Sequence, residues 1–305
     1  MPRPLDRFAI VLMIGLCVAW GGNQVAAKIA LVDFGPMTQC ALRNGIGAVV
    51  VLIYALALRP DAFRRDGTLA AGLAVGVLFA LEFILLFFAV ARTTASSAVV
   101  FLFTAPFFVA LGALAFLPAE RLSVRQWVGV AIAFVGVAFG FYRPGSGASL
   151  VGCVLALLAG AAWGGTTLII KATELRRIDP TKTLLYQVVV AVLLSAPLAY
   201  GLGEKMPWRP SAAALAALLY QAVFVVGITY LAWFWLLKSY RAAELSALTF
   251  LSPVVGVLAG WALLGERPTP AFALALAGVA AGIVLLSWPA RLQAPIRTPS
   301  RPARS

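Results

Sequence analysis

The chain has 305 residues, of which 62% are hydrophobic and only 11% charged, and its mean hydropathy is +0.97. Soluble domains carry roughly a quarter charged residues, so this composition excludes a soluble globular protein and requires a surface that faces lipid. The net charge of +13 therefore indicates the cytoplasmic loops of a membrane protein and not a nucleic-acid partner.

The residue types that carry most enzyme and metal chemistry are scarce. The sequence contains no histidine, which removes the commonest metal ligand and general base. Cys17, Cys40 and Cys153 lie in apolar runs, and their spacing is typical of neither a metal site nor a disulfide framework. No paired carboxylates occur within the apolar runs. We therefore expect no metal, no cofactor and no enzyme activity.

Apolar runs divide the chain into ten predicted membrane spans. A helix needs about 20 apolar residues to cross roughly 30 Å of hydrocarbon. The first run follows Arg3 and Arg7 and is similar to a signal peptide, but nine further runs favour a span that is retained. The prolines and arginines of residues 291–305 predict a disordered basic tail. The expected spans are residues 8–29, 36–58, 68–90, 94–116, 122–142, 148–170, 181–202, 211–237, 245–264 and 269–288.

The basic residues predict how these spans are oriented. With the N-terminus inside, seventeen of the 24 Lys and Arg residues fall in cytoplasmic segments and six in outer segments, while Arg43 lies within a span. Because Lys and Arg concentrate in cytoplasmic loops, both termini are expected on the cytoplasmic side.

A short tryptophan-glycine stretch occurs twice, in residues 19–24 and 162–167, with the two tryptophans 143 residues apart. Positions i, i+3 and i+4 share one face of a helix, so each stretch presents a tryptophan beside polar side chains. Two ordinary tryptophans at the membrane surface are the alternative interpretation. The duplication favours two cavity-lining faces, which consist of Trp20, Asn23 and Gln24, and of Trp163, Thr166 and Thr167.

The duplication continues through the spans that follow. Residues 1–145 and 146–290 each hold five predicted spans, and matched residues lie 144 to 147 positions apart. Five is an odd number, so the second half must enter the membrane from the opposite face. Such inverted repeats are typical of secondary transporters, which bind substrate between the repeats near the midplane. The matched residues include Pro36 and Pro180, Pro106 and Pro253, and Glu120 and Glu266.

Arg43 and Glu82 are the charged residues that lie well inside the predicted spans. A charge at the bilayer centre costs about 2.5–3.5 kcal/mol on insertion scales, so each is expected to face a cavity or a partner. A rise of 1.5 Å per residue places Arg43 about 10 Å and Glu82 about 13 Å from the outer face. Three interpretations stay open: a structural ion pair, capture of a substrate carboxylate by Arg43, and proton coupling by Glu82. The position that matches Arg43 in the second half is Gln187, and the position that matches Glu82 is near Thr229.

Pro106 and Pro253 each remove a helical hydrogen bond and are expected to free the carbonyls of Leu102 and Thr249. Interrupted helices inside a bundle line cavities or act as hinges, so both prolines are hinge candidates, and a tolerated kink is the alternative. Aromatic residues gather near these features, and we expect a minority of them to line a cavity. Together with Gln187 we assign to it Phe79, Phe101, Tyr186 and Tyr230.

Over residues 8–288 this pattern resembles the EamA family of the drug/metabolite transporter superfamily, and most of all its YddG-type bacterial amino-acid exporters. The resemblance implies ten helices in a basket around a central cavity, in the bacterial inner membrane. It also implies export of amino acids, above all aromatic or other apolar ones, or of related metabolites, by alternating access. Glu82 is no part of the family pattern, and Gln187 stands where a symmetric pair would need a second arginine.

The expected partners are a small-molecule substrate, the lipid bilayer and, as a candidate coupling ion, protons, and the expected state is a monomer. An importer of the same fold has the same sequence features, so the direction of transport rests on the resemblance. A passive channel stays open as an alternative, although channel filters usually need rings of carbonyls or charges and no such loop is visible.

Overall fold

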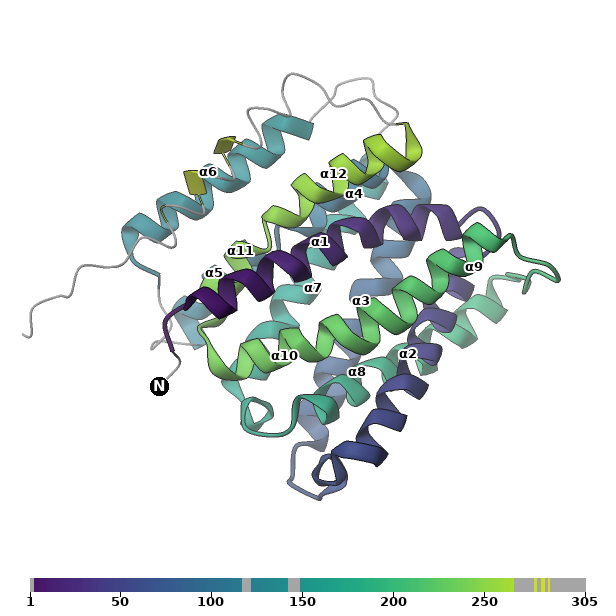
Figure 1. Ribbon diagram of the computed structural model, residues 1–305, viewed down its shortest axis with the longest axis horizontal. Coiled ribbons are helices and arrows are strands. Elements are labelled where there is room, and N and C mark those ends of the chain that lie inside the picture. The colour runs from purple at the N-terminus through teal and green to yellow at the C-terminus, as the bar shows by residue number, and fades with distance from the viewer. Residues whose placement is uncertain are drawn as a thin grey trace, which may run out of the picture.

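The computed structural model describes residues 3–116, 122–141 and 149–265, together with residues 277, 278, 281, 282 and 285. Within these residues the chain is helical, apart from an isolated β-bridge between Arg3 and Tyr240. Seven of the described helical stretches are long and apolar enough to cross a membrane. Figure 1 shows these helices packed side by side, with the N-terminus at the end of the bundle where α10 ends.

The predicted spans agree with most helix boundaries. The first three helices begin and end within two residues of the prediction, as do α7 and α8. A proline or a capping side chain marks the starts of α1, α2, α7 and α8. Residues 1–145 contain α1 Arg7–Ala30, α2 Pro36–Leu58, η1 Pro60–Phe63, α3 Leu69–Arg92, α4 Ala95–Leu102, α5 Ala105–Phe116 and α6 Val124–Phe141. Residues 146–265 contain α7 Leu150–Ala172, η3 Glu174–Arg176, α8 Pro180–Gly201, α9 Ala212–Leu219, η4 Tyr220–Thr229, α10 Tyr230–Ser239, α11 Ala242–Leu248 and α12 Leu251–Leu264.

The tenth predicted span, residues 269–288, lies almost wholly outside the described residues, as do Glu120, Glu266 and the predicted tail. The fourth and ninth spans are each interrupted by a turn, at residues 103–104 and 249–250. Pro106 and Pro253 therefore stand in the first turn of α5 and α12, where a missing N–H would be unpaired in any helix.

Hydrogen bonds within the two turns differ from our expectation. The Thr249 carbonyl is not left free by Pro253, because it accepts a hydrogen bond from the Ser252 amide at 2.9 Å. The hydroxyl of Thr104 donates to the Phe101 carbonyl at 2.7 Å, and that of Thr249 donates to the Ser246 carbonyl at 2.5 Å. Each turn is thus closed by its own threonine, which supplies a hydrogen bond to a backbone carbonyl of the interrupted helix.

The predicted eighth span contains a π-helix that the sequence did not indicate. The stretch Ala212–Ser239 has 28 residues, whereas α3, at the matching place in the first half, has 24. A π-helix forms i→i+5 hydrogen bonds and holds more residues per turn, so extra residues are accommodated without an equal gain in length. The π-helix ends at Thr229, directly before Tyr230.

Lys28 and Lys171, which follow the two tryptophan-glycine stretches, make matching contacts. Lys28 Nζ donates to the carbonyls of Val90, at 2.8 Å, and Thr93, at 3.1 Å, at the end of α3. Lys171 Nζ donates to the carbonyl of Tyr240, at 2.5 Å, at the end of α10. Each lysine thus satisfies the last carbonyls of a helix, where a positive charge is also favoured by the helix dipole.

The starts of α1 and α7 contact the same two helix ends. Asp6, which caps α1, accepts a hydrogen bond from the Tyr240 hydroxyl at 2.7 Å. Gly152, at the start of α7, packs so closely on Thr93 that a Cβ atom there would lie 2.8 Å from the Thr93 Cβ. Since α1 starts where α7 ends and α7 starts where α1 ends, the two helices run in opposite directions.

The first glycine of each tryptophan-glycine stretch lies at a helix crossing. A Cβ atom on Gly21 would lie 2.7 Å from the backbone nitrogen of Gly256 and the carbonyl of Ser252 in α12. A Cβ atom on Gly164 would lie 2.7 Å from the Phe108 Cβ in α5. Small residues let membrane helices approach closely, so these contacts give a physical reason for the glycine in both copies.

A polar bridge joins the two halves at one end of the bundle. Lys182 at the start of α8 contacts Asp66, which precedes α3, with Nζ 2.9 Å from Oδ2. Burial by itself would raise the pKa of Asp66, but hydrogen bonds from Thr68 and Lys182 outweigh it and lower that pKa to about 2. The bridge therefore keeps its charge at every physiological pH.

Candidate functional site

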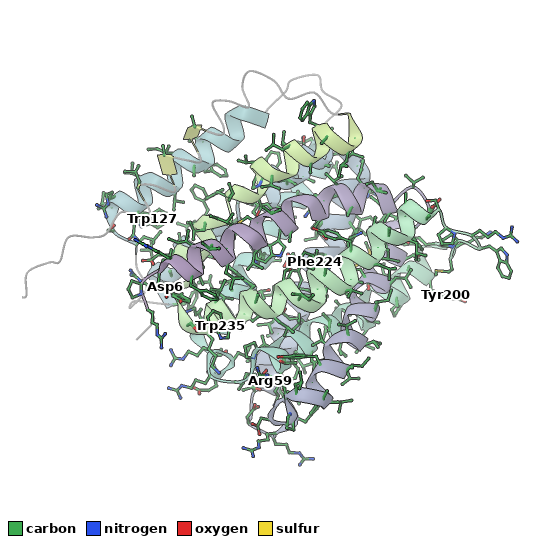
Figure 2. The ribbon with its side chains drawn as sticks, viewed as in Figure 1. Asp6, Arg59, Trp127, Tyr200, Phe224 and Trp235 are labelled. Carbon is green, nitrogen blue, oxygen red and sulfur yellow. The ribbon has the colours of Figure 1, made fainter. Side chains whose placement is uncertain are left out.

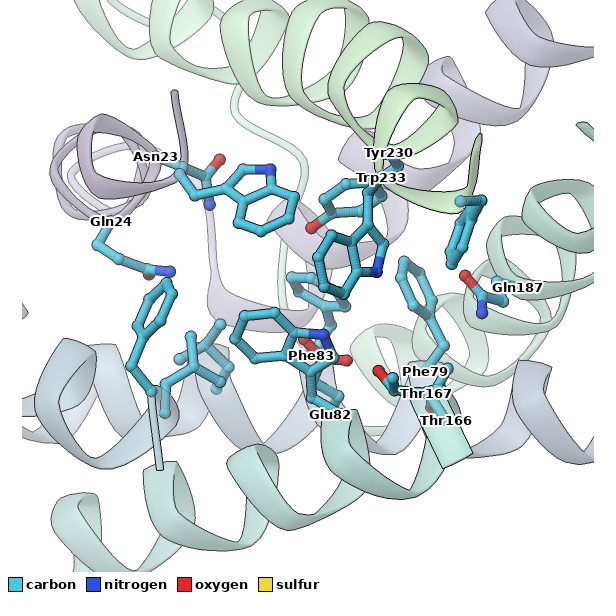
Figure 3. Close-up of a pocket in the computed structure, with 16 residues that line it drawn as sticks. Asn23, Gln24, Phe79, Glu82, Phe83, Thr166, Thr167, Gln187, Tyr230 and Trp233 are labelled. Atoms are coloured by element: carbon cyan, nitrogen blue, oxygen red, sulfur yellow. The ribbon is translucent and has the colours of Figure 1, made fainter. Parts of the chain in front are cut away.

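A cavity lies between α1, α3, α7, α8 and α10, where both tryptophan-glycine stretches meet. It holds about 570 Å³ of space that no atom fills, part of which is open to the outside. Figure 3 shows the labelled side chains converging on this space from several helices. The cavity is lined by Trp20, Asn23, Gln24, Phe79, Glu82, Phe83, Leu86, Leu102, Phe103, Trp163, Thr166, Thr167, Gln187, Tyr230, Trp233 and Phe234.

Aromatic rings form most of the wall. Trp20 makes edge-to-face contacts with Trp163, at 5.9 Å between ring centroids, and with Trp233, at 5.4 Å. Phe103 packs edge-on against Trp163 at 5.2 Å. The Trp20 indole N–H donates to the hydroxyl of Thr229 at 2.9 Å, which holds this ring in place. Such a wall suits a flat aromatic group, because the contact between two aromatic rings contributes about 0.5–1.5 kcal/mol in addition to the free energy of burying their surface.

Four polar side chains of the wall keep unused hydrogen-bonding atoms. Buried and without a hydrogen-bond partner are Asn23 Oδ1, Gln24 Oε1, Thr166 Oγ1 and both amide atoms of Gln187. Leaving a buried polar atom unpaired costs about 1–3 kcal/mol. A substrate or water that enters the cavity can supply the missing partners, so the wall is suited to bind a polar solute.

Glu82 brings a carboxyl group to the same wall. Its side chain is 6% exposed and borders the cavity, and it forms no hydrogen bond or ion pair with any described residue. An ionised carboxylate in such a place needs a cation, so Glu82 is positioned to bind either a proton or a positively charged group of the substrate.

Arg43 lies behind the wall and not in it. Its side chain is fully buried, its Nη2 donates to the Tyr230 hydroxyl at 2.7 Å, and its guanidinium stacks 4.0 Å from the centroid of the Phe83 ring. It forms no ion pair with a carboxylate of the described residues, so the direct Arg43–Glu82 contact is absent. Cation–π contacts replace part of the hydration of the guanidinium. A substrate in the cavity would meet Tyr230 and Phe83 before Arg43.

Most of the predicted site residues line this cavity. Besides Arg43, the exceptions are Phe101 and Tyr186. Phe101 does not line the cavity. α4 ends one residue later, and Leu102 and Phe103, at this helix end, line the cavity instead. Tyr186 packs against Gly72 near the start of α8, with the centroid of its ring 5.9 Å from Lys182 Nζ. The predicted residues that line the cavity are Trp20, Asn23, Gln24, Phe79, Glu82, Trp163, Thr166, Thr167, Gln187 and Tyr230.

Several lining residues were missed by sequence reasoning although a helical pattern points to them. Phe83 and Leu86 follow Phe79 at i+4 and i+7 in α3, on the face that Glu82 also occupies. Trp233 and Phe234 follow Tyr230 at i+3 and i+4 in α10. Continuing the helical face of Phe79 along α3, and that of Tyr230 along α10, would have identified these four residues.

In the part of the chain that the structure describes, no group of three Cys, Asp or Glu side chains gathers to hold an ion, and Glu82 is the one carboxylate that lines the cavity.

The model of the EamA-like transporter family matches this chain twice, at residues 7–142 and 150–288. The chain belongs to the EamA-like transporter family. Transport of small molecules across a membrane, not catalysis, is what its family members do, and the apolar helices described above make this EamA protein a multi-pass membrane protein.

Relatives cover nearly its whole length at low identity. The protein is 26% identical to the uncharacterized transporter YvbV of Bacillus subtilis over 298 residues, which are 95% of this chain and 94% of that one. It is 27% identical over 277 residues to a probable amino-acid metabolite efflux pump of Salmonella typhimurium, covering 87% and 88% of the two chains. A riboflavin transporter of Rhizobium johnstonii is 29% identical over 175 residues, 56% of this chain and 54% of the relative.

The fold is shared with a solved crystal structure. That structure superposes with a TM-score of 0.74 at 20% sequence identity, and the match covers 92% of this chain and 96% of the other.

Proposed function

We propose that this EamA-family transporter exports amino acids with aromatic or other apolar side chains, or related small metabolites, across the bacterial inner membrane by alternating access. The observation that carries the proposal is the cavity between the two halves, where an aromatic wall, one carboxyl group and unpaired amide atoms surround a common space. An amino acid offers the complementary groups: a ring for the wall, an ammonium for Glu82 and the unpaired amide oxygens, and a carboxylate for Gln187 Nε2 and the Thr166 hydroxyl.

The charges of the cavity favour a substrate that carries an amine. Glu82 borders the space, whereas Arg43 is separated from it by Phe83 and Tyr230. An acid without an amine would place its charge near Glu82 with no accessible cation to offset the repulsion. Amines and zwitterionic amino acids avoid this penalty, so we rank them above simple carboxylic acids.

Ten helices in two inverted repeats, with both termini cytoplasmic, are part of the proposal. The opposite directions of α1 and α7 support it, as do the matched contacts of Lys28 with Thr93 and of Lys171 with Tyr240. The two matches to the family model fall within residues 1–145 and 146–290. The count of Lys and Arg supports cytoplasmic termini.

The names of two relatives bear on substrate and direction. The Salmonella relative is described as an amino-acid metabolite efflux pump, which supports export of that class. The Rhizobium relative is described as a riboflavin transporter, and an aromatic wall also suits a fused-ring solute. Riboflavin is therefore the second candidate substrate, and it lacks the amine that we expect Glu82 to bind.

The turns before Pro106 and Pro253 are the proposed hinges. In Pro253→Ala the new N–H can donate to the Thr249 carbonyl, which would add one helical hydrogen bond between α12 and the turn at residues 249–250 and stiffen that turn. We expect the transport rate to fall severalfold while the affinity for substrate changes less than twofold. Transport and binding should be measured on the same purified protein, and an unchanged rate would mean that the turn is rigid during transport.

Counterflow into proteoliposomes tests the proposed function. The purified protein is reconstituted, the vesicles are loaded with one amino acid or with riboflavin, and uptake of the labelled compound is compared with that of protein-free vesicles. We expect counterflow for aromatic or apolar amino acids and none for their deaminated acids. If riboflavin shows counterflow and no amino acid does, the substrate is riboflavin and not an amino acid. Equal leakage of unrelated solutes would indicate a channel.

A further inference from the structure

A second cavity opens at the end of the bundle where α2 and α10 end and α8 begins. It has about 1270 Å³ of empty space and lies where several spans reach their ends, so it sits at the level of the membrane surface. Figure 2 labels Arg59 and Trp235 at this end, whereas Tyr200 is labelled at the opposite end. Helices from both halves contribute to it, and none of its residues lines the aromatic cavity.

Basic side chains dominate this second cavity. Arg3, Arg59 and Lys238 line it, opposed by the single carboxylate of Asp179. Asp179 is already used in part, because it caps α8 by accepting a hydrogen bond from the Thr181 amide at 2.8 Å. The Arg3 guanidinium also interacts electrostatically with Asp6, but Asp6 does not line the cavity, so three cations face one carboxylate among its lining residues.

Donor atoms in the cavity are left for a ligand. Arg59 uses Nε to donate to the Tyr54 hydroxyl at 3.2 Å, and its two terminal nitrogens have no partner among the described residues. The guanidinium of Arg3 likewise has none there, although the Arg3 backbone is held by a hydrogen bond from its amide to the Ser239 carbonyl. Two guanidinium groups and an ammonium around one space are the donors that bind phosphate.

Apolar groups continue from the cavity to the outside of the bundle. Trp235 lines the cavity and packs edge-on against Phe8, at 5.9 Å between ring centroids. Phe8 is 62% exposed and Leu58, beside Arg59, is 65% exposed, which in a membrane protein means contact with lipid. An aromatic residue at the surface level is typical of the membrane interface.

We propose that this cavity binds the phosphate head group of an anionic phospholipid. Arg3, Arg59 and Lys238 hold the phosphate, and the acyl chains extend over Phe8 and Trp235. Basic cavities between membrane helices are suited to such head groups, and each nearby Lys or Arg contributes about 1 kcal/mol. A free phosphate ion offers the same chemistry to the basic residues but gains nothing from the apolar groups. The bound lipid links α2, α8 and α10 and thus stabilises the packing of the two halves.

The test measures binding to the purified, delipidated full-length protein by native mass spectrometry, with phosphatidylglycerol and phosphatidylcholine added in turn. Arg59→Gln/Lys238→Gln is compared with Arg64→Gln/Arg177→Gln, which removes two exposed charges outside the cavity at the same end. We expect wild type and control to prefer phosphatidylglycerol. The Arg59/Lys238 variant should bind it roughly 10- to 30-fold more weakly.

A third arm adds inorganic phosphate as competitor. Phosphate at millimolar concentration that displaces phosphatidylglycerol would support the basic site and identify a soluble anion as its ligand, whereas no displacement supports the lipid. Equal binding of the two lipids by wild type, or an equal loss in both double variants, would overturn the proposal.

Discussion

Glu82→Gln is expected to weaken binding of amine-bearing substrates about 10- to 150-fold and to remove any dependence of their transport on the proton gradient. A hydrogen bond to a charged group contributes about 1.5–3 kcal/mol, and glutamine keeps the size of the side chain but not its charge or its proton. Because no described residue forms a hydrogen bond or an ion pair with Glu82, the exchange should leave the fold intact.

Three measurements on Glu82→Gln separate a functional from a structural role. Thermal unfolding reports the fold, equilibrium binding reports affinity, and uptake at several values of the pH gradient reports coupling. Glu174→Gln is the matched control, because this carboxylate is 61% exposed and lies outside the cavity. If Glu82→Gln transports with unchanged affinity and unchanged response to pH, Glu82 binds neither substrate nor protons.

Gly21→Ala and Gly164→Ala are each expected to destabilise the protein by about 1–3 kcal/mol and to lower the yield of folded transporter. The added methyl group on Gly21 would lie 2.7 Å from backbone atoms of Gly256 and Ser252, which cannot rotate away. On Gly164 it would press on Phe108. The helices must separate to accept it, and such overpacking costs about this much.

Gly15→Ala is the control for this experiment. It adds a methyl group to α1 at a position with no other atom within 4 Å, and alanine is the better helix former. Thermal unfolding in detergent should show unchanged or raised stability for Gly15→Ala. If Gly15→Ala lost a similar amount of stability, the effect would come from helix propensity or membrane insertion and not from the helix crossings at Gly21 and Gly164.

The sequence predicts the regular part of the fold well, because the runs of apolar residues and the capping residues are local signals. Pro36 and Pro180 mark helix starts at the positions observed. The π-helix from Tyr220 to Thr229 leaves no such signal, since its residues are as apolar as those of an α-helix and only its hydrogen bonds differ. The turns near Pro106 and Pro253 were expected, but the threonines that close them were not.

The same limit applies to the site. Trp20, Asn23 and Gln24 line one cavity, because their spacing along the helix gives the three side chains a shared direction. The predicted depth of a residue in the membrane does not determine toward which neighbouring helix its side chain points. Arg43 and Glu82 were expected at similar depth, but the structure places Glu82 at the cavity and Arg43 behind Phe83.

Transport by Trp163→Ala tests most directly whether the aromatic cavity is the substrate site. Trp163 lines the cavity, whereas Trp208 is 92% exposed outside the helices, so Trp208→Ala is the matched control. Counterflow is measured per folded molecule in proteoliposomes. We predict a loss of at least tenfold for Trp163→Ala, from the lost stacking and buried area, and normal transport for the control. Equal transport by wild type and Trp163→Ala would contradict the proposal that substrate binds in this cavity.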